Sequence, residues 1–228
     1  MSKIFCVVGK SGSGKSTIID DMFKMYGNTK NIEQFNLKLL VYHTTRERRQ
    51  GESSDEYIFD TEEQFEEYKS QNQIIEHREY TTKNNDIVHY YTLKQDIDLN
   101  KNNYIVKASF DQYENYKNYF GEDDVKLIYI YTDPKELLLR TINRANTYKD
   151  LLEVCRRFVS DDEQFRDLAV HPNHMIINDN MGDDKFKRFV SIVSNDEQPK
   201  TTQNNKKPAA YIRKKAYEII KIIENDLQ

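Results

Sequence analysis

Residues 3–17 read Lys-Ile-Phe-Cys-Val-Val-Gly-Lys-Ser-Gly-Ser-Gly-Lys-Ser-Thr. The apolar run 4–8 is typical of a strand buried in a parallel sheet. The glycines that follow allow a tight turn whose backbone N–H groups converge on one anion at a helix N-terminus. Lys15 adds a positive charge, and Ser16 offers a hydroxyl that suits Mg²⁺. This P-loop spacing predicts a site for ATP or GTP phosphates formed by Gly9, Ser11, Gly12, Ser13, Gly14, Lys15, Ser16 and Thr17.

Composition indicates a globular protein. The chain has 228 residues, of which 37% are apolar and 32% are charged, and this length can bury a sizeable core. Its two cysteines, Cys6 and Cys155, have no metal-binding spacing, so we expect buried free thiols. No stretch is long and apolar enough for a membrane span, and no signal-peptide pattern is present. We therefore expect a cytoplasmic protein that does not bind membranes.

Charge is spread unevenly along the chain. The net charge is −4, although residues 199–228 contain seven Lys or Arg and only three Asp or Glu. The remaining body is therefore acidic, which argues against a long basic surface for nucleic acid. We predict a linker at 195–208 and an amphipathic helix at 209–228 that docks on the core; a partner or dimer surface is the alternative. The chain is expected to be a monomer or a homodimer.

Hydrophobic periodicity and turn residues predict alternating strands and helices. The strands are expected at 4–8, 37–42, 57–59, 73–80, 87–92, 104–108, 125–131 and 175–177. The helices are expected at 16–26, 61–70, 111–119, 133–145, 150–168 and 183–193. This order predicts an α/β fold of the P-loop NTPase type, a parallel sheet flanked by helices with a small mixed or antiparallel insert.

A polar, arginine-rich segment follows the second predicted strand, with the sequence Thr44-Thr-Arg46-Glu-Arg-Arg49-Gln-Gly-Glu52, and Tyr57 and Phe59 come after it. Arg46 and Arg49 are suited to bidentate contacts with one phosphate, and a tyrosine hydroxyl can complete the shell. Together with the P-loop, this segment resembles the guanylate kinase family over residues 3–193. The family transfers the γ-phosphoryl of ATP to GMP, with Mg²⁺.

The resemblance implies roles for individual residues. Arg46, Arg49, Tyr57 and Tyr90 match residues that hold the GMP phosphate, while Glu76 and Thr92 match residues at the guanine base. Arg140 and Arg144 stand where a helix and a lid bring arginines to the transferring phosphates. Arg157 matches a further phosphate arginine, and Asn178 an asparagine on the ATP side. The implied catalytic set is Lys15, Arg140, Arg144 and Arg157, with Ser16 on the metal.

The resemblance also implies the domain boundaries. The P-loop core comprises residues 1–34, 93–142 and 151–194, the NMP-binding subdomain residues 35–92, and the lid residues 143–150.

The sequence departs from the family pattern on the base side. Tyr42 stands where the family usually has a serine near guanine O6, and Lys107-Ala-Ser109 replaces an Asp-x-Asp segment. We include Tyr42 and Ser109 in the predicted GMP site. The departures leave open a monophosphate kinase of another base preference, such as a deoxynucleotide kinase.

Two alternatives belong to other classes of protein. A non-catalytic binding module of similar fold is disfavoured because the P-loop is intact, and an ATPase or GTPase acting on macromolecules lacks a clear Walker B aspartate after 104–108. The five histidines show no zinc spacing and no triad partner, so we assign them to packing or loops.

Overall fold

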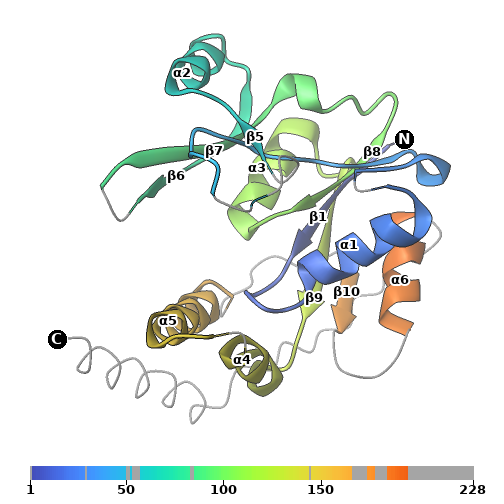
Figure 1. Cartoon of the computed structure of the whole chain (residues 1–228). Helices are drawn as coiled ribbons and strands as arrows, with labels where there is room; N and C mark the ends of the chain where they lie inside the picture. Colours follow the sequence, from blue (N-terminus) through green and yellow to red (C-terminus); the bar gives the residue numbers. More distant parts are fainter. Residues whose placement is uncertain are drawn as a thin grey trace. The chain divides into compact units, whose positions relative to one another are not determined.

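The computed structural model describes residues 2–28, 30–49, 52, 57–82, 85–143, 145–165, 174–177 and 184–194. The chain divides into two compact units (Figure 1). Unit 1 comprises residues 1–6 and 23–126, and unit 2 comprises residues 7–22 and 127–228. Arg144, Asn178, the predicted linker 195–208 and the predicted helix 209–228 lie outside the described residues.

Unit 2 carries the P-loop. The last residues of strand β1 (Ile4–Val8) lead into the loop, and helix α1 (Lys15–Tyr26) begins directly after it. Strand β9 (Val125–Tyr131) pairs in parallel with β10 (His174–Ile177), with Ile130 opposite Ile176. Helix α6 (Asp184–Val193) lies beside β10 (Figure 1).

Two further helices of unit 2 pack together through an apolar cluster. Helix α4 (Pro134–Ile142) is capped by Asp133, whose side chain accepts the N–H of Lys135 at 3.0 Å, and its first residue is proline. Both features favour a helix start at this point. Helix α5 (Tyr148–Gln164) follows, and Leu137 and Leu138 of α4 pack on Phe158 and Val159 of α5.

Unit 1 contains two sheets. In the first, the initial residues of β1 neighbour β8 (Asn103–Lys107), β8 pairs in parallel with β3 (Leu37–Leu39), and β3 pairs antiparallel with β2 (Asn31–Ile32). Short 3₁₀ turns lie at Glu33–Phe35 and Lys94–Asp96. Helix α3 (Phe110–Phe120) follows β8.

The second sheet of unit 1 has the order β5 (Ile58–Phe59), β4 (His43–Thr44), β7 (Ile87–Leu93), β6 (Ile74–Thr81). The β6–β7 and β4–β7 pairs are antiparallel, and β4–β5 is parallel. Helix α2 (Glu62–Ser70) packs on this sheet through the fully buried Phe65, which contacts Tyr91 and Leu93.

The α/β fold with a parallel sheet flanked by helices confirms the predicted fold class. The predicted strand 125–131 and the helix start at Thr61 agree with the structure. The single strand predicted at 37–42 is wrong, because β3 ends at Leu39 and the chain joins the second sheet at His43. The mainly apolar run Leu37-Lys-Leu-Leu-Val-Tyr42 contains no glycine or proline that would mark this change of sheet. The short strand β2 was not predicted.

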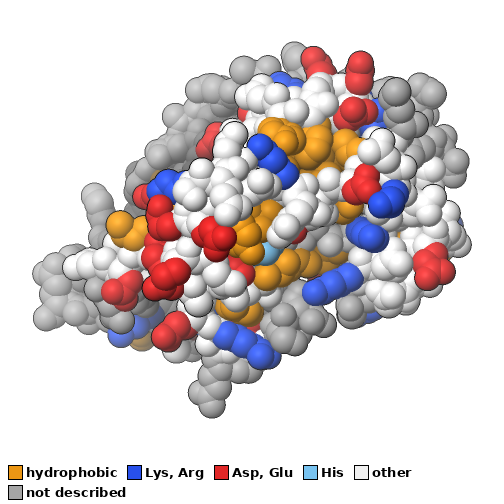
Figure 2. Space-filling model, turned by 90° about the horizontal axis from the view of Figure 1, so that it is seen from above, with side chains coloured by type: hydrophobic (Ala, Val, Ile, Leu, Met, Phe, Trp, Pro, Cys, Tyr) orange, Lys and Arg blue, Asp and Glu red, His pale blue; other side chains and the backbone are white. Residues whose placement is uncertain are grey.

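The thiols of Cys6 and Cys155 are free and buried, as expected. On the face shown in Figure 2, lysine and arginine side chains are scattered among aspartate and glutamate. Among the described helices, none combines the length and apolarity needed to cross a bilayer.

Candidate functional site

The P-loop has the backbone that its sequence requires. Gly12 and Gly14 have φ angles of +79° and +92°, in the left-handed region that favours glycine. A Cβ atom on Gly12 would also collide with Thr141 Cγ2 of α4. The loop is closed by the N–H of Ser13, which donates to the carbonyl of Lys10 at 3.1 Å. Gly12 is therefore required both by its dihedral angle and by the approach of α4.

Lys15 is the first residue of α1, and its ammonium folds back over the loop. Nζ donates to the carbonyl oxygens of Gly9 at 2.5 Å and Lys10 at 3.1 Å. Ser16 and Thr17 follow in the first turn and are exposed. The hydroxyl of Ser16 is therefore accessible beside a helix N-terminus, where a phosphate-bound Mg²⁺ would find a hard oxygen ligand.

A carboxylate already contacts one P-loop amide. The N–H of Ser11 donates to Asp161 Oδ2 from α5. Burial raises the pKa of the Asp161 carboxyl, while the Ser11 N–H and the charge of Lys15 act in the opposite direction. This contact shows that the loop offers an N–H group to an anion. Sequence reasoning missed Asp161, because nothing in the local pattern of α5 links it to the loop.

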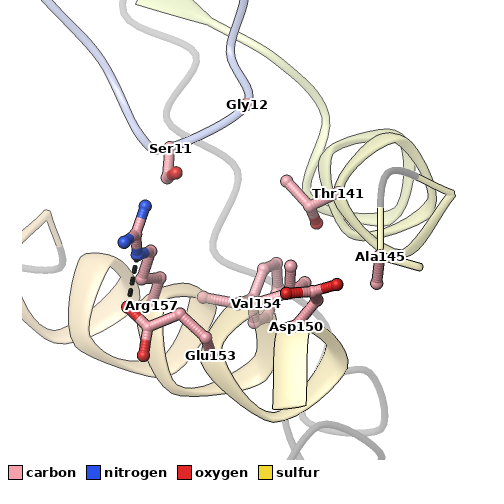
Figure 3. A pocket seen from close by; sticks show the side chains of 9 residues that line it. Ser11, Gly12, Thr141, Ala145, Asp150, Glu153, Val154 and Arg157 are labelled. Carbon is pink, nitrogen blue, oxygen red and sulfur yellow. Dashed lines mark hydrogen bonds and ion pairs between the residues drawn. The ribbon is translucent and has the colours of Figure 1, made fainter. Parts of the chain in front are cut away.

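A pocket of about 300 Å³ opens beside the P-loop (Figure 3). Its lining comes from the loop, from α4 and its following segment, and from α5, and comprises Ser11, Gly12, Thr141, Ala145, Asp150, Glu153, Val154, Arg157 and Phe158. The Arg157 side chain extends from α5 toward the loop that carries Ser11, and its Nε donates to Glu153 Oε1 at 2.7 Å (Figure 3). Arg140 is ion-paired with Glu136 at 2.9 Å on α4. Arg157, predicted as a catalytic residue, therefore lines one pocket together with Ser11 and Gly12, which were predicted to bind ATP.

Unit 1 holds the predicted phosphate shell of the second nucleotide. Arg46 donates through both terminal nitrogens to the two carboxylate oxygens of Glu52, at 2.9 and 2.6 Å, and its Nε donates to the hydroxyl of Tyr90 at 3.0 Å. The guanidinium also lies over the ring of Tyr57, at 5.1 Å from the centroid. Arg46, Tyr57 and Tyr90, which were predicted to bind the GMP phosphate, are therefore brought together.

Glu52 marks where an anion is held in this shell. Hydrogen bonds from Arg46 and then from the Arg49 backbone N–H lower the pKa of Glu52 to about 2. The hydrogen bond with Glu52, and after it the one with Tyr90, raise the pKa of Arg46, while burial acts in the opposite direction. The side chain of Arg49 is exposed, so the structure brings its backbone, rather than its guanidinium, to the Glu52 carboxylate. A planar guanidinium that grips a carboxylate in this way is also suited to a phosphate.

Glu76 is the most deeply buried acid of unit 1. It lies on β6 opposite Thr92 of β7, and the residue is 2% exposed. Arg78 Nε lies 3.1 Å from Glu76 Oε1, an ion pair that lacks hydrogen-bond geometry. Burial raises the pKa of Glu76, and the charge of Arg78 partly counteracts this effect. Among the residues that the structure describes, neither carboxylate oxygen of Glu76 has a hydrogen-bond partner.

The residues around Glu76 form one polar cluster. The Tyr42 hydroxyl donates to the carbonyl of Lys107 at 3.1 Å and accepts from Gln112 Nε2 at 2.7 Å. Thr92 Oγ1 shares a hydrogen bond with the Tyr116 hydroxyl at 2.8 Å. Charge interactions of Glu76 with both Tyr42 and Tyr116 show that these groups lie near the buried carboxylate. Tyr42, Glu76 and Thr92, which were predicted for the base side of the GMP site, therefore lie in one cluster.

The Ser109 side chain caps the N-terminus of helix α3. Its hydroxyl accepts the N–H of Gln112 at 3.3 Å, and its own N–H donates to Gln112 Oε1 at 2.8 Å. These reciprocal bonds are a capping box at the start of α3. The side chain of Ser109 is thus engaged with its own helix.

Sequence reasoning missed Arg78, Gln112 and Tyr116. Arg78 lies two residues after Glu76 on the same strand face, which period-two alternation could have indicated. Gln112 and Tyr116 are buried on α3, and only the packing of that helix brings them to Tyr42 and Thr92.

Comparison with known proteins bears on the family and the fold of the chain. The family model for guanylate kinase matches residues 1–196. A crystal structure of guanylate kinase from Anaplasma phagocytophilum is similar in fold, with a TM-score of 0.50 and 15% sequence identity, covering 99% of this chain and 86% of that one. Among curated proteins, none matches the chain. With a family model that spans most of its length, the chain belongs to the guanylate kinase family.

Proposed function

We propose that the chain is a nucleoside monophosphate kinase that transfers the γ-phosphoryl of ATP to GMP or dGMP, giving ADP and GDP or dGDP. The observation that carries this proposal is the buried Glu76 carboxylate, whose two oxygens have no hydrogen-bond partner among the described residues. A buried acceptor of this kind is costly unless a ligand supplies donors. The N1–H and N2–H groups of guanine are two adjacent donors that match a carboxylate.

The remaining residues supply phosphate binding. In unit 1, the proposed acceptor phosphate takes the place of the Glu52 carboxylate on Arg46, with Tyr90 and Tyr57 beside it. In unit 2, the proposed ATP phosphates accept from the P-loop amides and from Lys15, which turns from the carbonyls of Gly9 and Lys10. Arg140 and Arg157 add positive charge around the transferring group; Arg144 and Asn178, outside the described residues, are proposed for the same site.

Phosphoryl transfer needs alignment and charge neutralisation more than covalent help from the protein. Ser16 would hold Mg²⁺, which neutralises charge on the phosphate oxygens when bound. The proposed tasks of this chain are to orient the acceptor through Glu76 and Arg46 and to hold the donor through the P-loop. Thr92 and Tyr42 shape the base side, while the Ser109 side chain acts through α3.

A kinase of another base preference is the second candidate. It is favoured because Tyr42, on the base side of the proposed site, replaces the serine that is usual in the family. Tyr42 and Arg78 contact each other, with the guanidinium 5.3 Å from the ring centroid, and both lie beside Glu76. The two large side chains would leave less space beside Glu76 for a bound base.

Steady-state turnover over a panel of ribo- and deoxynucleoside monophosphates, with ATP, tests the proposal. The highest kcat/KM is expected for GMP or dGMP. Turnover of another monophosphate, with no turnover of GMP or dGMP, would favour the second candidate. Absence of turnover with every monophosphate tested would favour a non-catalytic module.

A further inference from the structure

The β6–β7 hairpin presents two different sets of side chains on its two faces. Successive residues of a strand point to opposite faces of a sheet. Glu76 and Arg78, paired with Thr92 and Tyr90, belong to the base-side face. His77 and Glu79, paired with Tyr91 and His89, belong to the other face, where Phe65 of α2 packs. The second face is therefore separated from the proposed nucleotide contacts by the sheet itself.

Two histidines and a glutamate converge on this second face. His77 Nε2 and His89 Nδ1 share a hydrogen bond at 2.9 Å. Together with a carboxylate oxygen of Glu79, these nitrogens form a group whose potential ligand atoms all lie within 4.8 Å of one another. The three residues are separated in the sequence by two and ten positions, a spacing that matches no common zinc motif. From the sequence alone, both histidines are therefore expected to be packing or loop residues.

Glu62 determines which nitrogen of His89 faces His77. Its Oε1 lies 3.1 Å from His89 Nε2, where a neutral imidazole donates its single N–H to the carboxylate. The other nitrogen, Nδ1, then presents its lone pair toward His77. A carboxylate that accepts from the far nitrogen of a histidine is the usual outer partner of a metal-binding imidazole.

The two rings are held by packing. The ring of His89 stacks on Phe65 with centroids 4.0 Å apart and planes 11° apart, and His77 lies 5.0 Å from the same ring. His89 and Phe65 are buried, whereas Glu79 is exposed. The imidazoles are thus fixed, and the glutamate keeps the freedom to close on an ion.

The distances suit a tetrahedral ion with only a small adjustment. Two nitrogens bound to zinc at about 2.0–2.1 Å stand about 3.3–3.4 Å apart, so the rings of His77 and His89 need to separate by about half an ångström. The carboxylates of Glu62 and Glu79 favour a cation, and they outnumber the nearby Lys69, whose ammonium lies 5.3 Å from the Phe65 ring centroid.

We propose that His77 Nε2, His89 Nδ1 and Glu79 bind a Zn²⁺ ion, with Glu62 orienting His89 and water completing the coordination. Two imidazoles and one carboxylate are a ligand set that zinc accepts. Because Glu62 begins α2 and the ligands lie on β6 and β7, the ion links this helix to the hairpin.

The experiment uses the full chain after removal of metal by a chelator. Zinc is titrated in competition with a chromogenic zinc indicator, and Co²⁺ is added separately to record the visible bands of a four-coordinate site. We expect one Zn²⁺ per chain, and a rise in the melting temperature when zinc is added. His77→Asn should abolish both effects, and Glu79→Gln should weaken binding at least tenfold.

Matched variants on α2 distinguish the site from general charge effects. Glu62→Gln should weaken zinc binding about 10- to 100-fold, as expected for an outer partner. Glu66→Gln removes the same charge from an exposed position of the same helix and should leave binding unchanged. Absence of zinc uptake by the wild type, retention of it by His77→Asn, or equal losses in Glu62→Gln and Glu66→Gln would each overturn the proposal. Circular dichroism of each variant establishes that it is folded.

Discussion

At the scale of single residues, Glu76 combines burial with a proposed role in binding the base. A carboxylate removed from water is unstable unless donors surround it, and Arg78 supplies only an ion pair without hydrogen-bond geometry. Burial without enough hydrogen-bond donors raises the pKa of Glu76. In the proposed function, a guanine base would form two charge-assisted hydrogen bonds with this carboxylate, which are stronger than neutral ones.

Glu76→Gln should therefore reduce kcat/KM for GMP. An amide accepts through one oxygen only and directs a donor group at the base, so at least one hydrogen bond to a charged group is lost. Such a bond contributes about 1.5–3 kcal/mol, which corresponds to about 10- to 150-fold. Steady-state kinetics with GMP varied measures the loss. The KM for ATP should stay within about twofold, and an unchanged kcat/KM for GMP would contradict the role of Glu76.

Arg46→Lys should raise the KM for GMP by about tenfold. Lysine keeps the charge but cannot reproduce the two parallel bonds now made to Glu52, nor the contact of Nε with Tyr90. Initial rates over a range of GMP concentrations measure the change. Equal KM values for GMP in variant and wild type would show that the phosphate is bound elsewhere.

Lys15 and Arg46 could be predicted from the sequence because their residue types and motifs suit phosphate binding. Glu76 could be predicted from the resemblance to the family. The sequence could not predict the neighbours that tertiary packing supplies. Gln112 and Tyr116 belong to a helix with ordinary amphipathic spacing, and only their burial beside Tyr42 and Thr92 makes them part of the base-side cluster. Ser109 shows the converse, since its capping role follows from Gln112 three residues later, a local signal present in the sequence.

At the scale of elements, local signals located helix starts better than sheet membership. Thr61 and Gln64 form a reciprocal capping box at the start of α2, and Asp133 with Pro134 starts α4. Sheet membership depends on partners distant in the sequence. Residues 37–39 pair with β8, and residues 43–44 pair with β7. One short segment without a glycine or proline therefore contributes strands to two sheets.

Thr61→Ala should destabilise unit 1 by about 0.5–2 kcal/mol, because the first turn of α2 loses the side chain that accepts the N–H of Gln64. Urea unfolding measures the change in free energy. Thr61→Ser keeps the acceptor and should lie close to the wild type. A Thr61→Ala protein as stable as the serine variant would show that the cap adds nothing.

His43 on β4 gives the fold a pH dependence. Burial lowers the pKa of His43, but the carboxylates of Asp96, 3.4 Å from Nε2, and of Asp60, hydrogen-bonded to Nδ1, outweigh burial and raise the pKa above 6.5. Because the folded pKa exceeds the unfolded one, the protonated ring contributes stability that is fully present below pH about 6.5. This contribution is lost as the pH rises through the folded pKa.

Asp60→Asn tests this linkage, since Asp60 Oδ2 lies 2.5 Å from His43 Nδ1. The free energy of unfolding of the wild type should fall more steeply than that of the variant as the pH rises above about 6.5. Urea titrations at several pH values measure both slopes. Parallel slopes would contradict a stabilising role for the charged imidazole.

At the scale of the whole molecule, the two sets of predicted nucleotide residues fall into different units. The P-loop, Arg140 and Arg157 belong to unit 2, and the described GMP residues all belong to unit 1. Sequence order conceals this division, because β1 contributes its first residues to one unit and its last to the other. Binding of the acceptor should therefore be separable from binding of the donor.

Lys15→Ala makes use of that separation. The substitution removes an ammonium that now donates to the carbonyls of Gly9 and Lys10, and that is proposed to bind the ATP phosphates. Turnover should fall about 10²- to 10³-fold, the loss typical of removing one donor to a transition-state charge. Calorimetric titration with GMP should give an unchanged Kd, since every described GMP residue lies in the other unit. If Lys15→Ala kept full turnover, the P-loop would have no part in the reaction; if GMP binding were lost with turnover, the two nucleotide sites would not be independent.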